Sequence, residues 1–103
     1  MATYTKAIKV AELAPGTKRT VVVNGKRIAI ANIDGVFFAI DDTCSHAHCS
    51  LGTEGFLDGS AIICGCHGAQ FDVTSGKVLS PPAPIDLTSY KTKVEGEDVL
   101  IAV

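Results

Sequence analysis

Cysteine and histidine residues occur at two places in this chain with spacings that suit metal binding. Seventeen residues separate two short segments, Cys44-Ser45-His46 and Cys64-Gly65-Cys66-His67. Each segment offers one thiolate and one imidazole, and their short spacing means that little backbone entropy is lost when the pair closes around a metal. Gly65 and Gly68 allow sharp backbone turns beside the second pair. The pattern therefore predicts a metal site made by Cys44, His46, Cys64 and His67.

Two kinds of metal centre accept this donor set. Zinc takes two Cys and two His in a tetrahedron, whereas a mixed-ligand 2Fe–2S cluster takes two Cys on one iron and two His on the other. Zinc fingers and ribbons usually pair Cys with Cys and His with His along the sequence. Each segment here pairs a Cys with a His instead. This pairing favours the 2Fe–2S cluster, and a structural zinc module is the alternative.

The wider sequence of these segments resembles a known family. The boxes Cys44-Ser-His46-Ala-His-Cys49 and Cys64-Gly-Cys66-His67-Gly68 are similar to the two cluster loops of the Rieske iron–sulfur proteins. The similarity continues through Phe71-Asp72, Ser75-Gly76-Lys77 and Pro81-Pro82-Ala83-Pro84, so that it covers residues 43–84 closely. The resemblance implies one Rieske-type 2Fe–2S cluster, with Cys44 and Cys64 on the inner iron and His46 and His67 on the outer iron near solvent.

Two cysteines and one histidine lie outside this ligand set. The resemblance implies a disulfide between Cys49 and Cys66, which would contribute about 3 kcal/mol in the chain-entropy model. The alternative is two buried thiols that the cytosol keeps reduced. His48 is interpreted as an exposed residue at the rim, because the C-x-H spacing favours His46 as the ligand.

The elements that must position these segments are β-strands. Asn24-Gly25 and Asp34-Gly35 have the composition of two-residue hairpin turns, and residues 10–14 suit a single helical turn. From residue 90 onward, Lys91 and Lys93 alternate with less polar residues and are expected on one solvated face. Strands are predicted at residues 4–9, 19–23, 27–33, 36–40, 61–64, 69–73, 77–79, 90–94 and 99–103, the last of them apolar on both faces and therefore buried.

We therefore predict an all-β Rieske iron–sulfur fold in a single domain, residues 1–103. Residues 1–42 and 85–103 form an antiparallel β framework, which is sandwich-like or barrel-like. A loop-rich cluster-binding insert, residues 43–84, holds all four cysteines and all three histidines.

Bulk properties exclude several functions. The formal net charge is −2, and the sequence has no basic patch of the kind that nucleic acid requires. No apolar run approaches the roughly 18 residues of a membrane helix, and the first residues lack the apolar core of a signal peptide. The sequence therefore predicts a soluble, cytoplasmic protein.

The resemblance is to the ferredoxin component of bacterial aromatic-ring hydroxylating dioxygenase systems. It implies an electron carrier, not an enzyme, that takes electrons from an NAD(P)H-dependent flavoprotein reductase and passes them to a terminal oxygenase. Partners are expected to dock transiently at a tip formed by His46 and His67, and the protein is expected to be a monomer. The alternative is a small Rieske subunit held permanently in a larger oxidoreductase of the nitrite or arsenite type.

The expected reduction potential follows from charge and hydrogen bonding. Two thiolates and two neutral imidazoles leave the oxidised cluster without net charge, and such centres fall at about −150 to +300 mV. In high-potential relatives, Ser and Tyr hydroxyls donate hydrogen bonds to the cluster. The matching positions here are Ala69 and Phe71, which have no donor. A potential in the lower part of the range is expected.

Overall fold

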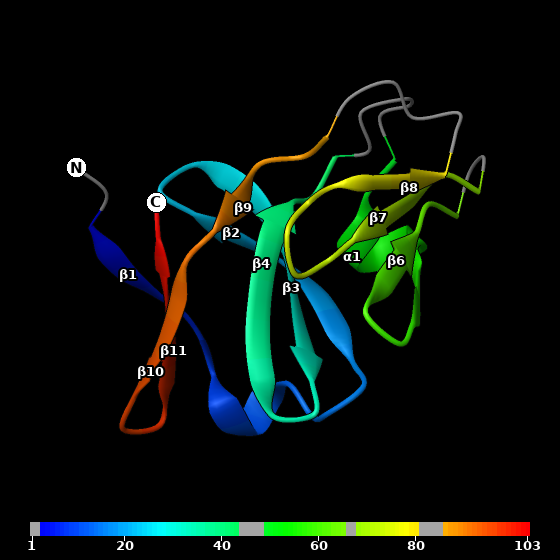
Figure 1. Ribbon diagram of the computed structural model, residues 1–103. Helices are drawn as coiled ribbons and strands as arrows, with labels where there is room; N and C mark the ends of the chain where they lie inside the picture. The colour runs from blue at the N-terminus through cyan, green and yellow to red at the C-terminus, as the bar shows by residue number, and fades with distance from the viewer. Residues whose placement is uncertain (1–2, 44–48, 66–67, 81–85) are drawn as a thin grey trace.

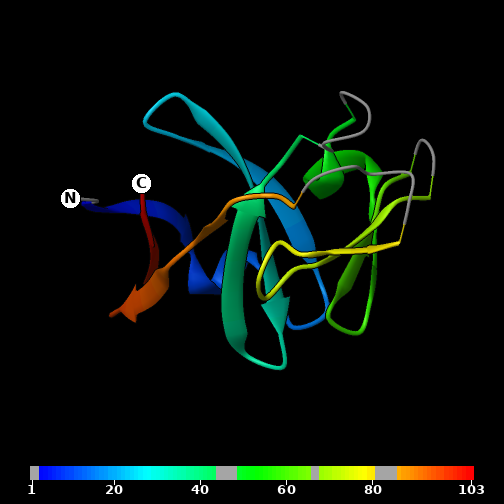
Figure 2. The same cartoon turned by 45° about the horizontal axis from the view of Figure 1, so that its top comes forward.

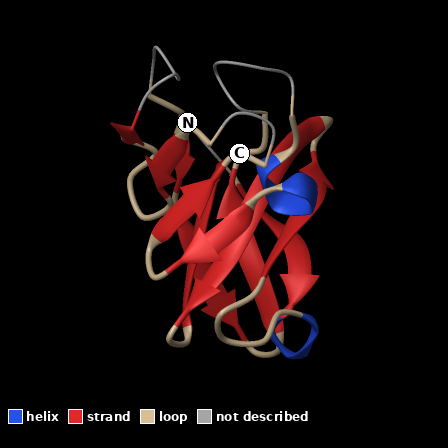
Figure 3. Ribbon diagram, turned by 90° about the vertical axis from the view of Figure 1, so that its right-hand side faces the viewer, coloured by secondary structure: helices blue, strands red, loops and turns tan. Residues whose placement is uncertain are grey.

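The computed structural model describes residues 3–43, 49–65, 68–80 and 86–103. Most of these residues are in β-strands, and the two helices among them are short (Figure 3). The strands pair antiparallel in three sheets (Figure 1). The predicted all-β fold with an antiparallel framework is therefore confirmed.

The central sheet follows the meander predicted from its turns. Its strands, in the order β2-β3-β4-β9, are β2 (Lys18–Val23), β3 (Lys26–Ile33), β4 (Val36–Asp41) and the short β9 (Ser89–Tyr90). Asn24 and Gly25 both have positive φ angles, 51° and 79°, as do Asp34 and Gly35, at 53° and 90°. Two consecutive positive φ angles define the turn that matches the twist of paired strands, which is why Asn-Gly and Asp-Gly occur here.

The terminal sheet brings the two ends of the chain together. It consists of β1 (Tyr4–Lys9), β11 (Asp98–Ala102) and β10 (Thr92–Glu95), in the order β1-β11-β10, with the short 3-10 helix η1 (Val10–Glu12) after β1. Val99 and Ile101 are fully buried, whereas Leu100 and Ala102 are only partly buried. The prediction that this last strand is buried on both faces is therefore wrong, because among the described residues one face of the terminal sheet packs against the central sheet and the other is partly open to solvent.

The segment from residue 90 onward belongs to two sheets. Tyr90 pairs with Ala39 in the central sheet, and Thr92 pairs with Ile101 in the terminal sheet, so the chain changes sheets at Lys91. Lys91 and Lys93 are exposed, as predicted, but Val94 is also 51% exposed. Val94 lies on an edge strand whose only neighbour among the described residues is β11.

The loop sheet is built from residues 56–80. Its strands, in sequence order, are β5 (Phe56–Asp58), β6 (Ala61–Ile63), β7 (Gln70–Asp72) and β8 (Val78–Ser80). The four-residue helix α1 (Leu51–Glu54) precedes it. The sequence predicted β6, β7 and β8 within one or two residues at each end. It did not predict β5 or α1.

The central sheet separates two hydrophobic cores. Ile28 and Ile30 of β3 pack toward the terminal sheet with Val99 and Ile101. Alternate residues of the same strand, Ala29 and Ala31, pack toward the loop sheet in a second core cluster. All four β3 residues are at most 1% exposed, as expected for a strand covered on both faces.

The three sheets lie side by side along the length of the molecule (Figures 1 and 2). The loop sheet is at one end, and the two termini are at the other. The loop sheet falls within residues 43–84, and its core is completed by Ala29, Ala31 and Ile40 of the central sheet. The division into a framework and an insert stays a prediction.

Candidate metal centre

The predicted ligands lie only partly among the described residues. Cys64 is described, whereas Cys44, His46 and His67 lie outside the described residues. Cys66 and His48 also lie outside them. The ligand set therefore stays a prediction, and the structure bears on it through Cys64 and through the residues that flank the two loops.

The described ends of the second loop, residues 64–65 and 68–69, connect β6 to β7 and are joined by backbone hydrogen bonds. The backbone N–H of Cys64 donates to the carbonyl oxygen of Ala69 at 2.7 Å, and the N–H of Gly68 donates to the carbonyl oxygen of Cys64 at 3.0 Å. Gly68 has a φ of 76°, a conformation that favours glycine. The Cys64 side chain is 2% exposed and forms no disulfide. A free thiol therefore lies buried at the base of this loop.

The first loop, residues 43–50, is closed by hydrogen bonds at its base. Thr43 and Ser50 form an isolated antiparallel bridge. The N–H of Leu51 donates to the carbonyl oxygen of Asp42 at 2.7 Å. Ser50 is also the N-cap of α1, and its hydroxyl accepts a hydrogen bond from the N–H of Thr53 at 3.2 Å. The chain therefore leaves β4 and enters α1 at adjacent points.

The described parts of the two loops contact α1 and a common core cluster. A Cβ atom on Gly65 would overlap the carbonyl oxygen of Glu54, so the last residue of α1 touches the second loop. Cys49 of the first loop packs against the core cluster that contains Cys64 and Ala69 of the second loop. The described parts of the two loops are thus held against one core, as a shared metal centre requires.

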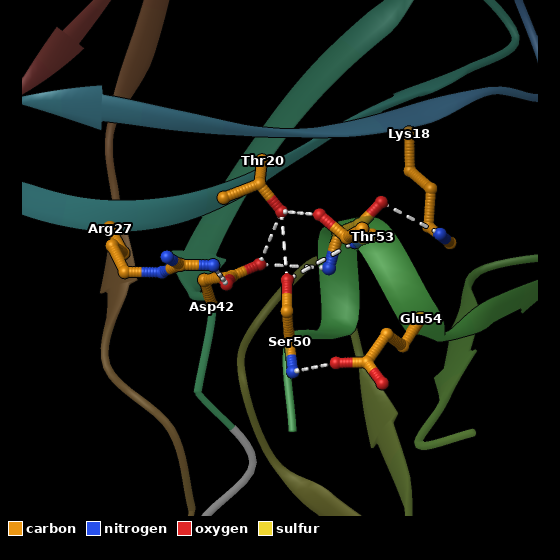
Figure 4. Close-up of polar contacts among 8 residues, drawn as sticks. Lys18, Thr20, Arg27, Asp42, Ser50, Thr53 and Glu54 are labelled. Atoms are coloured by element: carbon orange, nitrogen blue, oxygen red, sulfur yellow. Dashed lines mark hydrogen bonds and ion pairs between the residues drawn. The ribbon is translucent and has the colours of Figure 1, made fainter. Parts of the chain in front are cut away.

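A buried polar network that no sequence motif predicted supports the first loop (Figure 4). The Asp42 side chain is 0% exposed, and its Oδ1 accepts hydrogen bonds from the Thr20 hydroxyl and from the N–H of Gly52, both at 2.8 Å. Its Oδ2 lies 3.3 Å from the Nη2 atom of Arg27, with which it forms an ion pair. The signal that could have found this network is an acidic residue at the end of a strand, two residues before a predicted ligand.

Lys18 adds a contact between the central sheet and α1. Its Nζ donates to the carbonyl oxygen of Gly52 at 2.8 Å. Burial lowers the pKa of Lys18, and the charge of Asp42 acts in the opposite direction. The ammonium group therefore lies partly out of water, and it satisfies a carbonyl oxygen of the short helix.

The chemistry around Cys64 fits an iron–sulfur centre. A buried thiolate is a soft ligand of the kind that iron–sulfur clusters use. Ala69 and Phe71 are both 0% exposed and pack in the same core cluster as Cys64. These side chains exclude water from the thiol and offer it no hydrogen-bond donor. In the part of the chain that the structure describes, no three His, Cys, Asp or Glu side chains form a metal-binding group, and Cys64 is the only predicted ligand there.

The first loop also carries a disulfide-bonded cysteine. Cys49 is bonded to a sulfur that lies outside the described residues. The predicted partner, Cys66, is outside them as well, so the pairing of Cys49 with Cys66 stays a prediction.

The structure contains no helix, within the residues it describes, that is long and apolar enough to span a bilayer.

Comparisons with known proteins agree with this geometry. Residues 3–91 match the family described as the Rieske [2Fe-2S] domain. The biphenyl dioxygenase ferredoxin subunit of Pseudomonas sp. (strain KKS102) is 43% identical over 99 residues, which cover 96% of this chain and 91% of that protein.

Two solved structures extend the similarity to the whole fold. The ferredoxin of carbazole 1,9a-dioxygenase from Nocardioides aromaticivorans IC177 has a TM-score of 0.92 and 27% identity, covering 98% of both chains. A chain in a complex of reduced oxygenase and oxidized ferredoxin of carbazole 1,9a-dioxygenase has a TM-score of 0.90 and 33% identity, covering 99% of this chain and 94% of that one. With its fold, its buried thiol and these matches, this chain belongs to the Rieske [2Fe-2S] domain family, and its cofactor is a Rieske-type 2Fe–2S cluster.

Proposed function

We propose that this chain is the ferredoxin component of an aromatic-ring dioxygenase system. In this role it takes electrons from an NAD(P)H-dependent flavoprotein reductase and passes them to a terminal oxygenase. The observation that carries the proposal is the 43% identity to a biphenyl dioxygenase ferredoxin subunit over nearly the full length of both chains. The chain is an electron-transfer component and not a catalytic subunit, as its relatives are named.

The proposed ligands are Cys44 and Cys64 for the inner iron, and His46 and His67 for the outer iron. When bound, the cluster accepts and releases one electron. The burial of Cys64 and its free thiol support its place in this set. A zinc site is disfavoured because the family match is to a 2Fe–2S domain.

The Cys49–Cys66 disulfide is part of the same proposal. Cys49 is disulfide-bonded and Cys64 is free, which leaves Cys44 and Cys66 as the possible partners. Cys44 belongs to the proposed ligand set, and Cys66 does not. We expect a non-reducing peptide map to join Cys49 to Cys66, and a map that joins Cys49 to Cys44 would contradict the ligand set.

The proposed docking surface is the end of the molecule that carries the two loops, around His46 and His67. Among the described residues, Phe56 supports this choice, since it is 63% exposed. Its ring lies beside Gly65, where a built Cβ would be 3.7 Å from the Phe56 Cε2 atom. Exposed aromatic residues are enriched in interfaces, and redox encounters bury small areas.

The monomeric state and the cytoplasmic location stay predictions.

Reconstitution with a biphenyl-type reductase and oxygenase tests the function. We expect iron and acid-labile sulfide in equal amounts in the purified chain, and oxygenase turnover that depends on added chain. The Cys64→Ser variant is the control, because it removes a proposed ligand, and we expect it to lose both the iron and the turnover. A wild-type chain without acid-labile sulfide, or turnover that is equally fast without the chain, would contradict the proposal.

A further inference from the structure

Asp42 is a buried carboxylate that electron transfer itself does not require. It follows β4 directly, it lies two residues before Cys44, and its side chain is 0% exposed. Burying a charged group is unfavourable unless hydrogen bonds and an opposite charge compensate for it. The compensating groups are the Thr20 hydroxyl of β2, the Arg27 side chain of β3 and the Gly52 N–H of α1. Asp42 therefore holds these three elements together.

The hydroxyl of Thr20 is the centre of this arrangement (Figure 4). It donates to Oδ1 of Asp42 at 2.8 Å, and it lies 2.9 Å from the hydroxyls of Ser50 and Thr53. A hydroxyl has one proton and two lone pairs. Because its proton is directed at Asp42, the Thr20 oxygen accepts from both Ser50 and Thr53. One hydroxyl of β2 therefore joins the end of β4 to the first turn of α1.

Asp42 contacts both ends of the first loop, through its carboxylate and through its main-chain carbonyl oxygen. The chain enters the loop directly after Asp42, and the loop ends at Ser50 and α1. The N–H of Gly52 in α1 donates to Oδ1 of Asp42, and the N–H of Leu51 donates to the Asp42 carbonyl oxygen. A Cβ atom on Gly52 would overlap the hydroxyl of Thr20, so α1 lies in direct contact with β2. Asp42 thus sets where the first loop begins and where it ends.

Helix α1 also contacts the second loop, so its position affects the position of that loop. The first turn of α1 is fixed by Asp42, and its last residue, Glu54, touches Gly65 through its carbonyl oxygen. Gly65 stands between the proposed ligands Cys64 and His67. A displacement of α1 would therefore alter the spacing between the two loops that hold the cluster.

We propose that Asp42, acting through Thr20 and α1, is a positioning residue that sets the spacing of the two cluster loops. The inference rests on the proposed ligand set. The potential and the retention of a cluster depend on hydrogen bonds to its sulfurs and on solvent access, both of which follow loop spacing. Loss of the network should therefore change these properties in addition to the stability of the fold.

Thr20→Val tests the inference, since truncating Asp42 itself risks preventing folding. The variant removes the shared hydroxyl and keeps the shape of the side chain. We expect cluster loss at 25 °C to accelerate at least about five-fold, the factor that corresponds to the net loss of one of its three hydrogen bonds, and the midpoint potential to move from the wild-type value. Thr20→Ser keeps the hydroxyl, and we expect it to restore both properties.

Thr92→Val is the matched control. Thr92 is also a half-buried threonine, and its hydroxyl donates to the carbonyl oxygen of Phe37 at 2.6 Å within the framework. We expect this variant to lower the thermal unfolding temperature while cluster loss and the midpoint potential stay at wild-type values. If Thr20→Val and Thr92→Val behave alike in both cluster properties, the inference is wrong. A wild-type chain that keeps its cluster but does not reduce an oxygenase would contradict the proposed function alone.

Discussion

Ala69 and Phe71 determine how much the protein stabilises added charge next to Cys64. Both side chains are fully buried in the same core cluster as this proposed ligand, and neither can donate a hydrogen bond. A centre with few donors to its sulfurs is harder to reduce, since the added negative charge is less stabilised. The midpoint potential is therefore expected in the lower part of the range of about −150 to +300 mV.

Ala69→Ser is expected to raise this potential. A new hydroxyl that binds the reduced centre more strongly by about 1–2 kcal/mol corresponds to roughly 40–90 mV. Potentiometric titration of both proteins measures the difference. Ala31→Ser is the control, because Ala31 belongs to the same core cluster but lies in the framework, and its potential should equal that of the wild type. A wild-type midpoint above about +150 mV, in the upper half of the range, would contradict the argument.

Tyr90 makes the stability of the framework depend on pH in the alkaline range. Its hydroxyl donates to Asp41 at 2.5 Å. Burial, the hydrogen bond and the charge of Asp41 together raise the pKa of Tyr90 to about 12. The unfolded value is about 10, so the folded protein binds this proton more tightly. The contribution of Tyr90 to stability is therefore complete below pH 10 and is lost as the pH rises toward 12.

Tyr90→Phe is expected to flatten the loss of stability in this window. Urea unfolding at pH 9 and at pH 11.5 measures the free energy of unfolding of each protein. Lysines also titrate at these values, so the prediction concerns the difference between the variant and the wild type. A wild-type protein that loses no more stability than the variant between the two pH values would sink the prediction.

At the scale of elements, α1 lies between the two loops and contacts both, through its N-cap Ser50 and through Glu54. A Cβ atom on Gly65 would overlap the Glu54 carbonyl oxygen at the end of this helix. Gly65→Ala is therefore expected to push the second loop away from α1 and to reduce the iron content of the purified protein by half or more. Iron and acid-labile sulfide assays measure the effect.

Gly59→Ala is the control for this substitution. Gly59 lies in the turn between β5 and β6, has a φ of 60°, and has open space where a Cβ atom would lie. Its substitution should cost about 1–2 kcal/mol of stability from backbone strain alone and leave the iron content unchanged. Equal iron content in the two variants would show that contact with α1 does not matter for the second loop.

The elements that the sequence predicted correctly are those specified by local chemistry. Asn24-Gly25 and Asp34-Gly35 adopt the positive φ angles that these residue types favour, and the strands beside them begin and end within one residue of the prediction. Helix α1 was missed because four residues carry little periodicity, and its N-cap bond from Ser50 supports only one turn. Strand β5 was missed because its three residues show no pattern apart from their pairing with β6.

The candidate site, too, could be predicted only in part from the sequence. The position of Cys64 at the end of a strand could be predicted from its neighbours. The network of Asp42, Thr20 and Gly52 could not, because its members are separated by up to 32 positions in the sequence and meet only when α1 packs on β2. The double burial assigned to residues 99–103 was wrong for a similar reason, since hydropathy does not tell which face of a sheet has a neighbour.

At the scale of the whole molecule, the end with the loop sheet presents Phe56 to any partner that approaches the loops. Phe56→Ser is expected to slow reduction of the oxygenase by the chain about ten-fold, as loss of an exposed aromatic contact worth about 1.4 kcal/mol would. Stopped-flow mixing of reduced chain with oxidised oxygenase measures the rate, and the midpoint potential should not change.

Val22→Ser is the matched control for docking. Val22 is 66% exposed, close to the exposure of Phe56, but it lies in the β2–β3 hairpin of the framework. Its substitution should leave the rate of oxygenase reduction unchanged. Equal rates for wild type, Phe56→Ser and Val22→Ser would place the docking surface elsewhere.

The two ends of the chain are neighbours. The N–H of Val103 donates to the carbonyl oxygen of Thr3 at 3.2 Å, and Tyr4 pairs with Ala102. They lie at the end of the molecule opposite the loop sheet (Figures 1 and 2). A linker of a few residues would therefore close the backbone into a ring without disturbing the sheets, since adjacent termini tolerate such rearrangement. Attachment of either end to a solid surface would leave the loop-bearing end facing away from that surface, where a partner protein could reach it.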